Sequence, residues 1–251
     1  MSLIGTEFKN HVAILTLNRG VTNALNLTLL QELDLIIGQV KQNAEVHSLV
    51  LSSANEKFFC IGFDIPALFG LSRAEFQIFY TTFNQVCLDL FTFPKPTMAA
   101  IPGHAIAGGC ILTLCCDYRF IAEGRKLMGV NEIKLGVPVP YPADCILRHL
   151  VGFRKARQIM DYGDLFPAAT AVELGLIDQI LPLQEVLSGA IEKIELVGSY
   201  PPDAFAMIKK NRVESIEAQI RAHLNEKQEY FLDCWYSAAT RPLLQKAMEK
   251  F

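Results

Sequence analysis

The segment Ile101–Asp117, IPGHAIAGGCILTLCCD, restricts the possible folds of this chain more than any other stretch. It contains a Pro-Gly pair, then Gly108 and Gly109, and then an apolar run of helical length. Glycines at the start of a helix let a ligand approach the backbone, because no side chain stands in the way. The helix N-terminus adds unpaired N–H groups and a positive dipole end. We therefore expect a strand-to-helix turn able to hold a negatively charged oxygen, although a tight turn without a ligand would need the same glycines.

The residues before this segment alternate between strand and helix patterns. His11–Leu17 and Ser48–Ser52 are short apolar runs typical of strands, and Leu25–Val40 between them repeats apolar residues at helical spacing. This order predicts a βαβ unit with parallel strands. A short helix is predicted to start at Asp64 and Pro66, and a longer one to cover Ser72–Phe93. Further strands are expected at Thr97–Ile101, Tyr118–Ala122, Lys126–Gly129 and, less regularly, Ile177–Leu181.

The second half of the chain is mostly helical in pattern. The predicted helices are Ala143–Leu150, Phe153–Met160, Ala168–Leu174, Leu183–Tyr200, Asp203–Arg212 and Val213–Ala239, and Arg241–Phe251 ends the chain. The fold class is therefore α/β, with an α/β core over residues 1–182 and a helical region over residues 183–251 that packs on the core.

Composition excludes several classes of protein. Apolar residues make up 51% of the chain and charged residues 20%, which is enough for a large core and argues against disorder. The net charge of −3 and the lack of a long basic cluster argue against a nucleic-acid partner. Seven cysteines without a CxxC pair indicate free thiols in a reducing compartment, either cytoplasm or an organelle matrix. No signal peptide and no apolar run of ~18 residues is seen, so no membrane association is expected.

Three blocks of the sequence together resemble the crotonase (enoyl-CoA hydratase/isomerase) superfamily. They are Phe59–Ile65 (FCIGFDI), Pro102–Cys110 with Cys116–Arg119 (CDYR), and Val130–Ile133 (VNEI) with Leu135–Val137 (LGV). The resemblance extends from about residue 6 to about residue 250. It implies a repeated ββα spiral core and a C-terminal helical region that assembles homotrimers or hexamers. It also implies an acyl-CoA thioester as the substrate and no separate cofactor or metal.

The resemblance assigns an oxyanion hole to two backbone N–H groups, those of Phe63 and Gly108. A backbone donor needs no particular side chain, so phenylalanine at the first position is compatible with this role. Further substrate contacts are implied for residues of the same blocks, namely Cys60, Ile61, Asp64, Ile65, Gly109, Ile111 and Asn131.

The position of acidic residues separates the possible reactions. Hydratases of this superfamily use two glutamates, and the first of the two positions is Ile111 in this chain, whereas the second is Glu132. Two carboxylates suit the addition of water, but one carboxylate beside an oxyanion hole suffices to move a proton from C2 to C4 of a 3-enoyl thioester. The Asn131-Glu132 pair, and the segments Leu165–Ala168 and Gly175–Pro182, most resemble mitochondrial-type Δ3,Δ2-enoyl-CoA isomerases of fatty acid degradation.

Other reactions stay open at this point. A hydratase is disfavoured by Ile111, and a dehalogenase by Lys134, which occupies the position of its nucleophilic aspartate. A hydrolase, a decarboxylase and a non-catalytic acyl-CoA-binding relative are the remaining alternatives. For a single-base reaction the pKa of Glu132 should be raised by an apolar pocket, for which Val130, Ile133, Val137 and Val139 are the candidates.

Several other residues have both a functional and a structural interpretation. His104, Cys60 and Cys110 are interpreted as packed side chains rather than catalytic groups, and Asp64 and Asp117 as structural. The basic group Lys209, Lys210 and Arg212 either meets the CoA phosphates or forms a solvated helix face. The aromatic residues Tyr230, Phe231 and Trp235 either close the acyl tunnel or pack in the core.

Overall fold

The computed structural model describes residues 2–249 and contains two β-sheets. The larger sheet has six strands. They are, in spatial order, β1 (Ile4–Lys9), β2 (Val12–Leu17), β3 (Ser48–Ser53), β5 (Thr97–Ile101), β7 (Tyr118–Ala122) and β10 (Gln179–Leu181). Only β1 is antiparallel to its neighbour. The predicted βαβ unit is confirmed, because β2 and β3 pair in parallel with helix α1 (Leu27–Gln42) between them in sequence.

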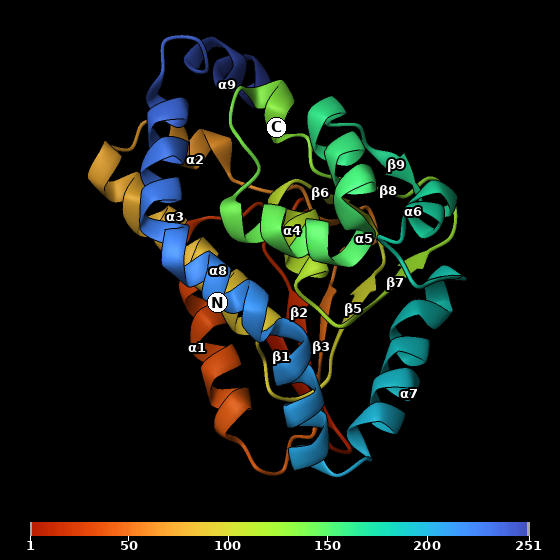
Figure 1. Cartoon of the computed structure of the whole chain (residues 1–251). Helices are drawn as coiled ribbons and strands as arrows, with labels where there is room; N and C mark the ends of the chain where they lie inside the picture. The colour runs from red at the N-terminus through yellow and green to blue at the C-terminus, as the bar shows by residue number, and fades with distance from the viewer. Residues whose placement is uncertain (1, 250–251) are drawn as a thin grey trace.

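Helices cover both faces of this sheet. Alternate side chains of β2 point to opposite faces, so that Val12 and Ile14 join a small cluster with α7 (Val186–Gly198). Ala13 and Leu15 of the same strand join the main core together with α1. Figure 1 shows α7 on one side of the sheet and α1 on the other. Burial on both faces explains why β2 and β3 are almost continuously apolar in sequence.

The smaller sheet delivers the three sequence blocks to one place. Its strands are β4 (Phe58–Cys60), β6 (His104–Ile106), β8 (Leu127–Gly129) and β9 (Phe166–Pro167). The first three are parallel neighbours, so their carboxyl ends lie at the same edge. Phe63 follows β4, Gly108 follows β6 and Glu132 follows β8. Parallel pairing therefore brings together residues that are separated by up to 69 positions in sequence.

Most of the remaining elements are helices. They are α2 (Ile65–Phe69), α3 (Arg73–Phe91), α4 (Gly108–Leu114), the 3₁₀ turn η1 (Glu132–Leu135), α5 (Tyr141–Tyr162), α6 (Ala168–Leu174), the 3₁₀ turn η2 (Leu183–Glu185), α8 (Pro202–Tyr236) and α9 (Arg241–Met248). Helix α5 is kinked at Gly152, where φ is 76°, which matches the two short helices predicted there. The predicted helix start at Asp64 is confirmed, because its side chain accepts from the Ala67 N–H.

The structure differs from the expected secondary structure in several places. The predicted helices Asp203–Arg212 and Val213–Ala239 form one continuous helix, α8, because the chain contains no glycine or proline between residues 203 and 236 to interrupt it. Strand β1 was not predicted, since only its first residue is buried and its sequence carries no alternating pattern. The last segment of the chain, for which no element was predicted, forms helix α9 over Arg241–Met248, and residues 250–251 lie outside the described residues.

The C-terminal helices pack on the core in two places. Helix α8 packs against α3 and α5, and α9 packs against α2 and the η1 turn. No helix within residues 2–249 combines the length and the apolar character that crossing a membrane requires. The predicted division of the chain after residue 182 stays a prediction.

Candidate active site

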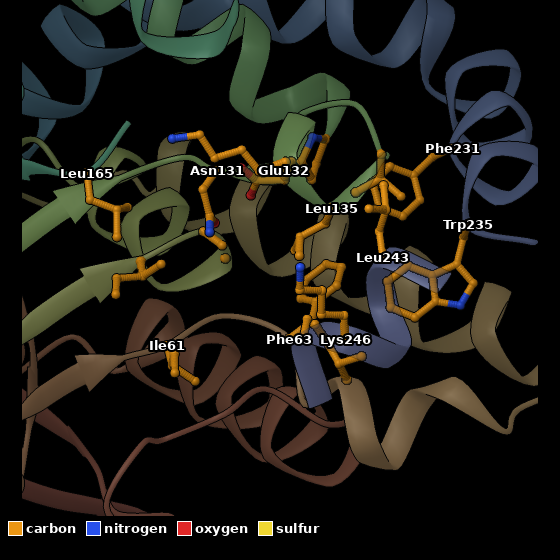
Figure 2. Close-up of a pocket in the computed structure, with 18 residues that line it drawn as sticks. Ile61, Phe63, Asn131, Glu132, Leu135, Leu165, Phe231, Trp235, Leu243 and Lys246 are labelled. Carbon is orange, nitrogen blue, oxygen red and sulfur yellow. The ribbon is translucent and has the colours of Figure 1, made fainter. Parts of the chain in front are cut away.

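A cavity of about 440 Å³ opens at the edge of the smaller sheet. Its walls come from the segments after β4, β6 and β8, and from helices α8 and α9. Figure 2 shows Ile61 and Leu165 on one side of the cavity and Phe231 and Trp235 on the other. Glu132 lies between them and is the only carboxylate among the lining residues of the described chain. The cavity is thus a largely apolar pocket with a single acidic group, and Asn131, Lys134 and Lys246 are its other polar side chains.

The backbone on either side of Gly62 lies against the start of α4. Gly62 has φ of 102°, and a Cβ built on it would lie 3.1 Å from the Gly108 nitrogen and 2.9 Å from the Ala107 Cβ. The chain is fixed there by a parallel bridge, in which the Leu25 N–H donates to Gly62 (2.7 Å) and the Asp64 N–H donates to Leu25 (2.9 Å). These contacts require glycine at position 62 and place the next residue, Phe63, beside Gly108.

Phe63 and Gly108 both line the cavity, and the structure records no acceptor for either N–H among residues 2–249. Gly108 is the first residue of α4, where a helix leaves its N–H groups unpaired. The residue before it, Ala107, has φ of 50°, an uncommon value for a residue with a side chain. Two free donors at the mouth of a helix are suited to binding one negatively charged oxygen.

Glu132 is the first residue of the η1 turn and only 6% exposed. Its Oε2 atom is buried without a hydrogen-bond partner in the described part of the chain. Burial raises the pKa of the carboxyl group from its ordinary 4.5 to about 7. Near neutral pH this group exists in both protonation states, which suits a group that takes up and returns a proton.

The pocket that raises this pKa differs in part from the predicted one. Val137 lines the cavity and Val130 is buried, as predicted. Ile133 is 52% exposed and contributes nothing to the cavity wall, because the η1 turn directs it outward, against Gly163.

The remaining predicted substrate contacts divide into two groups. Ile61, Ile65 and Asn131 line the cavity. The Oδ1 atom of Asn131 is a second buried oxygen without a partner within residues 2–249. The others, Cys60, Asp64, Gly109 and Ile111, are buried and do not line it. Their predicted contact with substrate stays a prediction.

Two of these residues, Gly109 and Asp64, have contacts that stabilise the fold around the site. A Cβ on Gly109 would lie 2.2 Å from the Cys60 carbonyl oxygen, so the glycine permits close packing of α4 against β4. The Asp64 carboxylate caps α2 and forms an ion pair with Arg19 (2.6 Å).

Two interpretations of packed side chains agree with the geometry. His104 accepts a hydrogen bond at Nδ1 from the Leu127 N–H (3.0 Å) and does not line the cavity. Burial raises the pKa of the Cys60 thiol to about 12 and also raises that of Cys110. Both thiols are therefore protonated near neutral pH and unsuited to nucleophilic attack.

The alternatives for the basic group on α8 are both wrong for Lys209. This lysine is only 2% exposed, and its Nζ donates to Asp117 (2.8 Å), which also pairs with Arg212. The pair joins α8 to the connection between α4 and β7 and confirms the structural role of Asp117. Lys210 is exposed, and so is Arg212 despite its pairing with Asp117.

The aromatic residues of α8 have separate positions. Phe231 and Trp235 line the cavity and also pack in the core, where Phe231 stacks on Tyr80 at 4.0 Å and Trp235 on Phe76 at 4.3 Å. Tyr230 is 57% exposed and lies outside the cavity.

Sequence reasoning missed the cavity wall formed by α9. Leu243, Lys246 and Ala247 line the cavity from the end of the chain. Their spacing of three and four residues places them on one helix face, and this was the available signal. Nothing in that spacing indicates which surface the face covers.

A comparison with protein families decides the classification. A family model described as Enoyl-CoA hydratase/isomerase matches residues 7–251.

The chain belongs to the enoyl-CoA hydratase/isomerase family.

Relatives of both named activities are similar to this chain. It is 29% identical to a short-chain-enoyl-CoA hydratase of Clostridium acetobutylicum, over 97% of this chain and 94% of that protein. It is 27% identical to the mitochondrial enoyl-CoA delta isomerase 1 of Mus musculus, over 99% of this chain and 85% of that protein. The chain is thus a crotonase-family acyl-CoA enzyme, and overall identity does not separate the two activities.

Solved structures confirm the predicted fold class. The crystal structure of human mitochondrial delta3-delta2-enoyl-CoA isomerase superposes with a TM-score of 0.95 at 25% identity, covering 99% of this chain and 98% of that one. An enoyl-CoA hydratase structure from Bacillus halodurans gives a TM-score of 0.90 at 24% identity over 98% and 100% of the two chains. The α/β crotonase fold with C-terminal helices is therefore shown.

Proposed function

We propose that this enzyme is a Δ3,Δ2-enoyl-CoA isomerase, which moves the double bond of a 3-enoyl-CoA to the 2-position. The observation that supports it best is the single carboxylate, Glu132, in a largely apolar cavity that is also lined by the residues of two free backbone N–H groups. Position 111, where hydratases of the family have their second glutamate, is a fully buried isoleucine. The chain therefore supplies no second carboxylate there.

The proposed reaction uses Glu132 twice. Its carboxylate removes a proton from C2, and the electrons of that C–H bond form a dienolate whose negative charge lies on the thioester oxygen. The N–H groups of Phe63 and Gly108 stabilise this oxygen. The protonated Glu132 then returns the proton to C4, so that the double bond lies between C2 and C3. A pKa of about 7 favours both steps, since neither the acid nor the base form is strongly preferred.

The cavity walls suit the acyl part of such a substrate. Ile61, Ile65, Phe231 and Trp235 supply apolar surface for a hydrocarbon chain. Asn131 offers a polar group next to the base. A role in fatty acid degradation and assembly as a homotrimer or hexamer belong to this proposal as well.

The test supplies the purified protein with 3-enoyl-CoA and 2-enoyl-CoA in separate assays, following the absorbance of the conjugated thioester. We expect the signal to rise from the 3-enoyl substrate, and Glu132→Gln to lower kcat by roughly 10²–10⁴-fold. The matched control is Glu214→Gln, the same change at an exposed position of α8, which should leave kcat unchanged.

Two outcomes would contradict the proposal. Rapid loss of signal from 2-enoyl-CoA, without any rise from 3-enoyl-CoA, would indicate a hydratase instead. Binding of CoA esters without turnover of either substrate would indicate a non-catalytic relative.

A further inference from the structure

The segment between α8 and α9 makes hydrogen bonds to the η1 turn and to the chain at the end of α2. The chain leaves α8 after Tyr236, forms a turn in which the Thr240 N–H donates to Ser237, and enters α9 at Arg241. Helix α9 then supplies Leu243, Lys246 and Ala247 to the cavity wall. The same short segment therefore completes the cavity and contacts the elements that hold its functional groups.

One contact of this segment is made to the turn that carries Glu132. Thr240 is only 2% exposed, and its hydroxyl group donates to the Gly136 carbonyl oxygen at 2.8 Å. Gly136 ends the η1 turn in the left-handed conformation, with φ of 79°, and its N–H donates to the carbonyls of Glu132 and Ile133. A Cβ at position 136 would lie 2.7 Å from the Thr240 oxygen. The hydroxyl group is thus fitted closely against the residue that closes the turn.

A second contact ties the segment to the opposite side of the site. The Arg241 guanidinium lies over the Phe69 ring, 3.4 Å from its centroid, and donates to the Phe69 carbonyl at 2.8 Å. The Tyr236 hydroxyl donates to the Leu71 carbonyl at 2.9 Å. Phe69 ends α2, the helix that begins two residues after Phe63. The segment therefore links the chain that follows Phe63 to the Glu132 turn.

Glu132 itself has little side-chain support. Its Oε2 has no partner in the described chain, so the place of the carboxylate depends on the place of the η1 backbone. Titratable groups facing this turn are Lys134, which is paired with Asp164, Lys246 on α9, and Tyr80 and Cys110, whose pKa values burial raises. These groups make no recorded hydrogen bond to the Glu132 side chain within residues 2–249.

We infer that Thr240 is a positioning residue that fixes the Glu132 turn through the Gly136 carbonyl and so holds the proposed general base beside the oxyanion site. This inference rests on the isomerase function proposed above. Loss of the hydroxyl group leaves a carbonyl without its donor and lets the turn shift. Displacement of a reacting group by about 1 Å can lower a rate by about 100-fold. A looser turn also admits water to Glu132, which lowers its pKa towards the ordinary value.

The test compares Thr240→Val, which keeps the shape and removes the donor, with Thr240→Ser, which keeps the donor. We expect Thr240→Val to lower kcat by about 10- to 100-fold with KM changed less than about twofold. The midpoint of kcat/KM against pH should move to lower pH by about half a unit or more. Thr240→Ser should have the wild-type kcat and the wild-type pH midpoint. Thr92→Val is the matched control, since Thr92 makes a similar bond to the Leu88 carbonyl (2.8 Å) outside the cavity.

A folded Thr240→Val with wild-type kcat and pH midpoint would overturn the inference, even if its melting temperature fell, because it would show a purely structural role. Thr240→Ala serves the same comparison if the valine does not fold. An infrared titration of the Glu132 carboxyl, with Glu132→Gln as the blank, gives a readout independent of turnover. If the wild type does not convert 3-enoyl-CoA, the isomerase proposal fails, and this titration still decides whether Thr240 controls Glu132.

Discussion

The Glu132 carboxyl group should cost the fold stability near neutral pH, and Glu132→Gln should remove that cost. In the folded protein burial raises its pKa from 4.5 to about 7. Between these two pH values the folded state keeps the proton while the unfolded state loses it, so the free energy of unfolding falls as pH rises. The glutamine amide is neutral at every pH and is about the size of the protonated acid, so this loss should not occur in the variant.

The size of the effect follows from the shift. One unit of pKa corresponds to 1.36 kcal/mol, so a change from 4.5 to about 7 corresponds to about 3 kcal/mol. Wild type and Glu132→Gln should have similar stability near pH 4.5. Above pH 7 the variant should be more stable by about 3 kcal/mol, or roughly 6–12 °C in melting temperature for a chain of this length. The variant that removes the proposed base should thus be the more stable protein.

Thermal and urea unfolding at a series of pH values, at one fixed protein concentration, measure this difference. Glu214→Gln is the matched control, since Glu214 is exposed and the change there should not alter the pH dependence. A difference between wild type and Glu132→Gln that stays constant from pH 4.5 to 8, or a variant that is less stable at pH 8, would refute a buried carboxyl with a raised pKa.

Three further predictions concern packing and specificity. Gly109→Ala should lower the free energy of unfolding in urea by about 1–3 kcal/mol, because its Cβ would lie 2.2 Å from the Cys60 carbonyl oxygen of β4. Gly38→Ala, on α1 with open space around it, should instead raise the free energy of unfolding by about 0.5–1 kcal/mol. Lys209→Met, which removes a buried partner from a carboxylate, should cost about 3 kcal/mol, and Lys210→Met on the exposed side less than about 0.5 kcal/mol; equal effects would contradict the ion pair. Trp235→Leu, by enlarging the cavity, should move the preferred acyl chain length upward in a series of 3-enoyl-CoA substrates, and an unchanged preference would exclude Trp235 as a chain-length limit.

Local sequence patterns were sufficient where one rule decides the structure. The strand–helix–strand order over residues 11–52 predicts the parallel pair, and Gly152 gives the break between the two parts of α5. Strand β1 escapes such rules, because it is held by pairing with β2 and buries only Ile4. The division of α8 into two helices was an error of interpretation, since no residue in that range stops a helix.

The site required contacts that spacing does not encode. The three blocks mark Phe63, Gly108 and Glu132, and the parallel strands β4, β6 and β8 explain why they meet. The wall made by α9 depends on where the end of the chain returns, which is not a local property. The burial of Lys209 likewise depends on Asp117, a residue 92 positions away that accepts its hydrogen bond.

The path of the transferred proton tests the central claim most directly. The substrate is a 3-enoyl-CoA carrying deuterium at both C2 positions, and the product is analysed by NMR after conversion in ordinary water. A single buried carboxyl that removes and returns the proton should leave a measurable fraction of product with deuterium at C4. Product that carries only solvent hydrogen at C4 would contradict the return of the proton by Glu132.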